Sequence, residues 1–310
     1  MKKPKGDTIM RKMKRVFISI LALATLGVAT GCEGLQFVAP PMGENSSSEE
    51  SSKKDGVSLT DEQWDEFVEI MEKSAVETNR TIHTTMTVQA EQSVKGLYEE
   101  WMSEKGTTTE KTDGRLEEYI ESMKYKESED GAWETRSDNK KSYKIYPKDY
   151  LNGEAEGEFV SYTQNDDGEW TCGSGYYQTS AGFGEEYEAL MTEELREVLV
   201  YNAETGIYSI TDEEITTTSE AYLGMPITNG QAVQKIHKME YEVKDGYLVR
   251  AYQDYEVELE GTIEINGETY EVYYYCDMEV EGEFGSYGTT KITLPSQIKD
   301  EVEALLEDEE

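Results

Sequence analysis

Between residues 247 and 280, apolar and charged side chains alternate in two runs separated by one turn signal. Successive side chains of a strand point to opposite faces, so this alternation predicts a sheet with one buried and one solvated face. Asn266-Gly267 lies between the runs and is typical of a two-residue hairpin turn. Such a turn places both apolar rows on the same face. The pairs at the centre of that face are Leu259 with Tyr274, Val257 with Cys276, and Tyr255 with Met278.

The preceding run of residues predicts a third strand joined to this hairpin. A two-residue turn at Asp245-Gly246 would mismatch the apolar faces of the two strands. A three-residue loop, Lys244-Asp245-Gly246 with Gly246 in the left-handed region, restores the match. It also places His237 opposite Gln253, the one polar residue of the inward row. We therefore expect a three-stranded meander with one continuous apolar face.

Three amphipathic helices are predicted from apolar residues at helical spacing. The first spans residues 61–77 and begins with a capping box formed by Thr60 and Gln63. A second is expected over 184–199, and a short third one after Pro295.

The rest of the chain is predicted to be mostly strand. Residues 80–91 alternate as a half-buried strand, and residues 156–178 and 198–210 predict two hairpins. The stretch 92–155 leaves helix and strand open.

Residues 1–31 are interpreted as a signal peptide rather than as part of the fold. A basic start is followed by an uncharged, mostly apolar run over 16–29, which is shorter than the about 20 residues that a membrane-spanning helix needs. The motif Ala29-Thr30-Gly31-Cys32 resembles the bacterial lipobox, with Ala29 where Leu is usual. The resemblance implies that Cys32 is lipidated and becomes the N-terminus at the outer face of the cell membrane. The alternative is an ordinary signal peptide that leaves Cys32 as a free thiol.

Residues 32–58 are rich in Ser, Glu, Gly and Pro and predict a flexible tether. Without the first 31 residues, the chain has 22 basic and 65 acidic residues and a formal net charge of −43. A surface this acidic repels phosphate backbones, which excludes nucleic acid as a partner. It also repels anionic lipid headgroups.

The order of these parts resembles that of the LolA and LppX/LprG-like lipoproteins. The matching segments are residues 79–90, 201–208, 243–248 and 288–295. The resemblance implies a mostly β (α+β) fold, in which a curved antiparallel sheet or half-barrel packs on one or two amphipathic helices in a single domain, residues 59–310. It also implies a concave side that can hold acyl chains. Fold analogy alone does not establish function.

No motif for catalysis or for metal or cofactor binding is found, so we expect no enzyme, no cofactor and no metal site. His83 falls on the polar face of its strand, and His237 is expected inside, beside Gln253. We also expect that Cys172 and Cys276 are not bonded to each other. Residues 289–294 are the expected neighbour of the strand that carries Cys276.

Two functions remain open from the sequence. The first is a module that binds or carries a lipid or another amphiphile, and its inward residues are Tyr255, Val257, Leu259, Tyr274, Cys276 and Met278, with His237 and Gln253 at a polar end. The second is a surface protein that contacts envelope glycan or protein through an acidic, Tyr-rich exterior. Its outward residues are Tyr252, Tyr273 and Tyr275. In that case the helix over 61–77 fills the core and no ligand is held inside.

Overall fold

A computed structural model describes residues 59–129, 132–152, 156–165, 167–178, 193–218, 227–265 and 267–307. The predicted signal peptide, the tether and Cys32 lie outside these residues. Most of the helix predicted over 184–199 also lies outside them, and its described end is the short helix α4 (Glu193–Val198).

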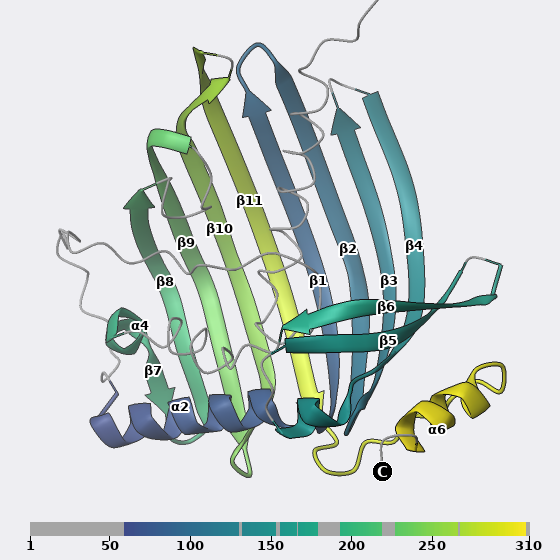
Figure 1. Ribbon diagram of the computed structural model, residues 1–310. Coiled ribbons are helices and arrows are strands. Elements are labelled where there is room, and N and C mark those ends of the chain that lie inside the picture. The colour runs from purple at the N-terminus through teal and green to yellow at the C-terminus, as the bar shows by residue number, and fades with distance from the viewer. Residues whose placement is uncertain are drawn as a thin grey trace, which may run out of the picture.

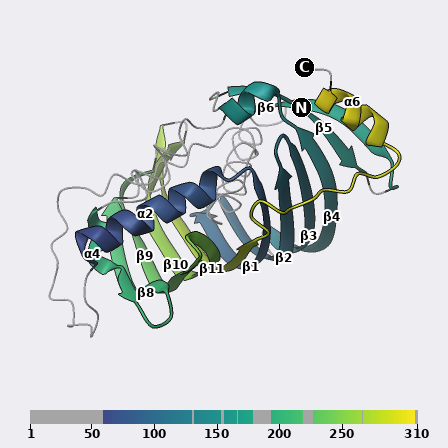
Figure 2. The same ribbon diagram turned by 90° about the horizontal axis from the view of Figure 1, so that it is seen from below.

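The described residues form one antiparallel sheet of eleven strands (Figure 1). Their order across the sheet is β6-β5-β4-β3-β2-β1-β11-β10-β9-β8-β7. The strands are β1 (Asn79–Val94), β2 (Tyr98–Asp113), β3 (Leu116–Glu129), β4 (Ala132–Ile145), β5 (Glu156–Gln164), β6 (Trp170–Gln178), β7 (Val200–Asn202), β8 (Ile207–Thr218), β9 (Ile227–Lys244), β10 (Tyr247–Ile265) and β11 (Glu268–Gly285). The sheet is curved and unclosed (Figure 2), which confirms the prediction of a mostly β fold.

Two meanders make up the sheet, and the first strand pairs with the last at its centre. Ala90 of β1 lies opposite Cys276 of β11. The expectation that residues 289–294 occupy this place is wrong, because β1 and β10 already pair with the two edges of β11. Residues 289–294 instead continue as coil towards α6 (Lys299–Glu307).

Helix α2 (Asp61–Val76) packs on one face of the sheet, defined here as the inner face (Figure 2). The predicted capping box is confirmed, with the amide of Gln63 donating to Thr60 Oγ1 at 3.2 Å and the amide of Thr60 donating to Gln63 Oε1 at 3.0 Å. The apolar stripe of the helix reaches β8, where the ring of Phe67 lies 4.6 Å from that of Tyr208.

The short helix predicted after Pro295 is confirmed as α6, and it packs on the opposite, outer face. Ile298 and Val302 are buried against Leu116 of β3 and Tyr143 of β4. The two helices thus cover different faces and different halves of the sheet.

The stretch in which helix and strand were both open, residues 92–155, forms the end of β1, all of β2, β3 and β4, and the 3-10 helix η1 (Lys148–Asn152). The strand expected over 80–91 and the hairpin expected over 156–178 are confirmed as β1 and as β5 paired with β6. The hairpin expected over 198–210 is confirmed as β7 paired with β8.

The connection between β9 and β10 differs from the predicted three-residue loop. Asp245 and Gly246 form a two-residue turn with φ of 56° and 74°, and Leu248 lies opposite Val243. The register then shifts by one residue because β10 carries a bulge at Val249. An extra residue reverses the side-chain alternation wherever it is inserted, so the bulge restores the match that the loop was expected to supply.

Candidate functional site

The six inward residues of the predicted binding surface lie together on the inner face. They are Tyr255, Val257 and Leu259 of β10 and Tyr274, Cys276 and Met278 of β11. All six are buried in one apolar cluster, which also includes Val88 of β1. The register predicted from Asn266-Gly267 is confirmed pair by pair. Alternation predicts that Glu256 and Glu279 on the other face are exposed; Glu279 is exposed, whereas Glu256 is half-buried.

The predicted pairing of His237 with Gln253 is wrong. Gln253 lies opposite Met239, and its amide nitrogen is 3.5 Å from the Tyr241 hydroxyl on the inner face. His237 occupies a second register shift, and its Nε2 lies 3.4 Å from a carboxylate oxygen of Glu256 on the outer face. The extra residue in β9 turns His237 away from the inner face, so the two residues do not mark a polar end of one surface.

The inner face changes from apolar to acidic between the centre of the sheet and β3. Inward residues of β1, β10 and β11 are mostly apolar, whereas the cross-strand registers place a series of carboxylates on β2 and β3. These inward carboxylates are Glu100, Glu104, Glu110, Glu117, Glu121 and Glu127. We define them as the acidic part of the inner face. It was not predicted, because its residues lie in the stretch that the sequence left open.

Glu104 lies at the border between the apolar cluster and the acidic part. It is opposite Val88 on β1 and Tyr125 on β3, and its side chain is only 6% exposed. It makes no hydrogen bond or ion pair with another described residue. Burial, and next the nearby Glu127, raise the pKa of Glu104 to about 7, and Arg136 offsets this only in part. The carboxyl group is therefore partly protonated at neutral pH.

Arg136 is the cation that lowers the pKa of Glu104, and it already interacts with other groups. Arg136 Nη2 lies 3.1 Å from Glu127 Oε1, and its guanidinium carbon lies 4.5 Å from the centre of the Tyr125 ring. Burial, and next the coulombic effect of Glu121, raise the pKa of Tyr125 to about 12. Arg136 therefore stacks on an uncharged phenol and pairs with a carboxylate other than Glu104.

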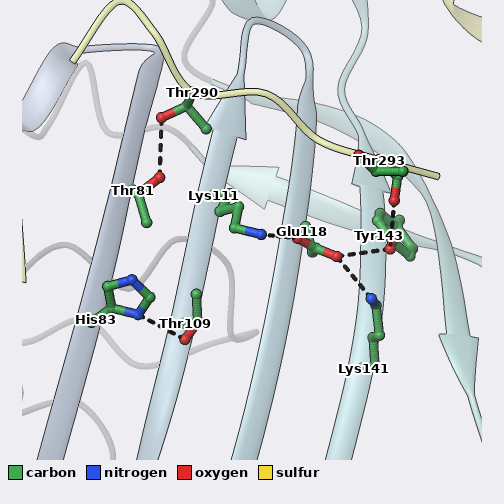
Figure 3. Close-up of polar contacts among 9 residues, drawn as sticks. All are labelled: Thr81, His83, Thr109, Lys111, Glu118, Lys141, Tyr143, Thr290 and Thr293. Carbon is green, nitrogen blue, oxygen red and sulfur yellow. Dashed lines mark hydrogen bonds and ion pairs between the residues drawn. The ribbon is translucent and has the colours of Figure 1, made fainter. Parts of the chain in front are cut away.

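The outer face carries a buried carboxylate, Glu118, which differs from Glu104 in having several partners (Figure 3). Glu118 accepts from Lys111, Lys141 and Tyr143, each at 2.8 Å. Burial acts to raise the pKa of Glu118, but these three donors outweigh it and hold the pKa below its ordinary value. The Tyr143 hydroxyl also lies 3.4 Å from the Thr293 carbonyl oxygen. This network has a structural role, since it ties β2, β3 and β4 to the segment that leads into α6.

The outward tyrosines of the alternative function are half-buried on the outer face. Tyr252, Tyr273 and Tyr275 alternate with carboxylates, and the Tyr252 hydroxyl donates to Glu279 at 3.0 Å. Burial, followed by that hydrogen bond, raises the pKa of Tyr252 to about 12. His83 is exposed on the same face, as predicted, with its Nδ1 at 2.9 Å from Thr109 Oγ1 (Figure 3).

Cys172 and Cys276 are free cysteines, one exposed on β6 and the other buried on β11, which confirms that they do not pair. Burial raises the pKa of Cys276 to about 12, so this thiol is neutral. Within the described ranges, no three His, Cys, Asp or Glu side chains are placed to hold a metal ion. The helices among these residues include none with the length and apolarity needed to cross a membrane.

No family model and no curated protein matches the chain. Among solved structures, the chain is similar to the translocator domain of the autotransporter NalP from Neisseria meningitidis, with 10% identity, a TM-score of 0.22, and coverage of 66% of this chain and 87% of that one. The β domain of the Bordetella autotransporter BrkA matches with 6% identity and a TM-score of 0.21, over 66% and 98%. OccK5 of Pseudomonas aeruginosa matches with 6% identity and a TM-score of 0.20, over 67% and 98%. Similarities this weak carry no argument about function, and the resemblance to LolA and LppX/LprG-like lipoproteins stays a prediction.

Proposed function

We propose that the chain is a lipid-anchored protein on the extracytoplasmic face of the cell membrane that binds an amphiphile on the inner face of its sheet. In this proposal the curved sheet acts as a half-barrel, with α2 packed inside it and α6 outside. The observation that carries the proposal is the arrangement of the inner face. One continuous apolar cluster spans β1, β10 and β11, and it borders directly on a row of carboxylates.

A sheet face with these two adjoining parts matches the two parts of an amphiphile. Ligand sites are mostly apolar with a few polar groups that fix orientation. Val257 and Cys276 lie buried at the centre of the apolar cluster, and Glu104 supplies a polar group at its border. Contact with the chain of a ligand would contribute about 25 cal/mol for each Å² of apolar surface removed from water.

Organic extraction followed by mass spectrometry tests this function. The protein should be secreted by its natural host with Cys32→Ser, so that no acyl chain of its own enters the extract. We expect about one amphiphile per chain. The same protein after unfolding and refolding in ligand-free buffer is the control, and it should give an empty extract. If both samples are empty, the amphiphile-binding proposal is wrong.

A second function, contact with envelope glycan or protein, is favoured by a different observation. The six inward residues are already buried, as they would be in a filled core. The outer face meanwhile presents tyrosine rings beside carboxylates at Tyr252, Tyr273 and Tyr275. Co-sedimentation with purified envelope glycan separates the two functions. Loss of sedimentation on Tyr252→Ala and Tyr275→Ala, together with empty organic extracts, would support this second function.

A further inference from the structure

Three carboxylates of this sheet are buried to a similar degree but differ in their partners. Glu117, which is 1% exposed, has Lys144 Nζ at 2.8 Å and accepts from the Tyr146 hydroxyl at 2.8 Å. Glu118 has two lysines and a tyrosine hydroxyl at the same distance. Glu104 has no such donor among the described residues. A buried carboxylate without a partner is costly, so its charge favours a cation supplied from elsewhere.

The surroundings of Glu104 define what such a cation must be attached to. On one side lie Val88 of β1 and, beyond it, Met278 of β11, both fully or almost fully buried in the apolar cluster. On the other side lie Tyr125 and Glu127 of β3, which add ring surface and a further negative charge. A small inorganic cation would satisfy the charge but would not use the apolar residues that adjoin Glu104.

We propose that the amphiphile bound on the inner face is cationic, with an amine or guanidinium group paired to Glu104 and an apolar chain lying along β1, β11 and β10. This inference rests on the proposed function and specifies its ligand class. Glu127, engaged by Arg136 at 3.1 Å, provides a second carboxylate that favours a positive headgroup and disfavours an anionic one.

Affinity for such a ligand rises with pH as the Glu104 carboxyl loses its proton. The titratable and charged groups that face it are Glu121, Tyr125 and Glu127 of β3, Arg136 of β4 and Cys276 of β11. Tyr125 and Cys276 stay neutral below pH 9, since the pKa of each is raised to about 12. An alkylamine keeps its charge across this range, because its pKa is about 10. The change between pH 5 and pH 8 therefore reports the carboxyl group and not the ligand.

Isothermal titration calorimetry with dodecylamine and dodecanoate, both below their critical micelle concentrations, tests this. The two probes have the same chain length and opposite charge. The protein is the chain with Cys32→Ser, in about 0.3 M salt, because screening removes most of the general attraction of an acidic surface for cations. At pH 7.5 we expect dodecylamine to bind at one site, about tenfold more tightly than dodecanoate.

Glu104→Gln should weaken dodecylamine binding about tenfold and leave dodecanoate binding the same or tighter. Glu99→Gln is the matched control, since it removes the same charge from the same strand at an exposed position on the outer face. We expect it to change neither affinity more than about twofold.

Equal binding of the two probes, or unchanged dodecylamine binding in Glu104→Gln, overturns the cationic-ligand inference and leaves the proposed function standing. If neither probe binds, the proposed function fails as well. The comparison of dodecylamine with dodecanoate on the protein that keeps Glu104 tests the cationic-ligand inference even if Glu104→Gln does not fold.

Discussion

Glu104 is expected to lower the stability of the folded protein at neutral pH. Its pKa is raised from 4.5 to about 7, so the folded state binds this proton more tightly than the unfolded chain. The free energy of unfolding therefore falls as pH rises from about 4.5 to 7 and stays reduced above that range.

Glu104→Gln should consequently stabilise the protein by up to about 3 kcal/mol at pH 8 and change it little at pH 4. Urea denaturation at the two pH values measures this difference, with Glu99→Gln as the control. A gain of equal size at both pH values would contradict the argument. Together with weaker dodecylamine binding, a more stable Glu104→Gln variant would show that the carboxylate is retained for binding and not for stability.

Gly106 is a second inner-face residue to consider, because it has almost no space for a side chain. A Cβ atom added there would lie 2.2 Å from the Ser122 carbonyl oxygen, and backbone cannot move aside as a flexible side chain can. We expect Gly106→Ala to lower the free energy of unfolding by about 1–3 kcal/mol. Gly173→Ala is the matched control, because the nearest atom to its Cβ, Ser161 Oγ, lies at 3.5 Å. Chemical denaturation of both variants checks this, and equal stability of the two would refute it.

At the scale of the element, α2 owes its first turn to the reciprocal bonds of Thr60 and Gln63. Thr60→Ala removes the acceptor for the Gln63 amide and should cost about 1 kcal/mol of stability. Because both residues act in one capping box, Thr60→Ala with Gln63→Ala should cost less than the sum of the single changes. Thermal denaturation of the three variants tests this, and simple additivity would argue against a shared cap.

Two of the three register shifts between β9 and β10 show how one extra residue redirects a strand. Val249 in β10 and His237 in β9 each shift the register by one residue. Alternation of polarity disfavours a two-residue turn at Asp245-Gly246, because that turn mismatches the apolar faces. The structure keeps that turn and corrects the mismatch further along the strand. Alternation within one strand shows which residues share a face, but it does not show where an extra residue is inserted.

At the scale of the whole molecule, the pairing of β1 with β11 joins the two meanders into one sheet. Both strands have paired neighbours on each side and bury alternate residues, whereas β6 and β7 are the edges. We therefore expect the amides of β1, β10 and β11 to exchange most slowly and those of β7 to exchange fastest among the strands. Hydrogen exchange followed by mass spectrometry measures this. Equal protection of β7 and β1 would contradict a core centred on the β1–β11 pair.

The proposed membrane location of the molecule depends on lipidation of Cys32. Cys32→Ala should release the protein from the membrane fraction in an unprocessed or soluble form. The reason is that the proposed acyl chains contribute about 0.8 kcal/mol of membrane affinity for each buried CH₂ group. Fractionation followed by intact-mass measurement checks this. Cys172→Ala is the matched control and should leave fractionation unchanged, since Cys172 lies on the described sheet. A processed Cys32→Ala protein that stays in the membrane fraction would refute the anchor.

Features that depend on residues close together in the chain could be predicted from the amino-acid sequence. The capping box of α2, the pairing of β10 with β11 and the separation of their faces all follow from local spacing and turn chemistry, and the structure confirms each. The capping box involves residues within one helical turn. In the β10–β11 hairpin a two-residue turn fixes the register, and a one-residue slip would expose the whole apolar row.

Two features follow from long-range pairing and could not be predicted from local sequence: β1 lies beside β11, and β2 and β3 line the inner face with carboxylates. On β2, polar residues occupy both faces for much of the strand, so alternation of polarity no longer distinguishes inside from outside. Glu104 looks like any other surface glutamate in the sequence. Its burial and raised pKa arise from residues 16 positions earlier and about 20 positions later, Val88, Tyr125 and Glu127, which are brought to it by cross-strand pairing.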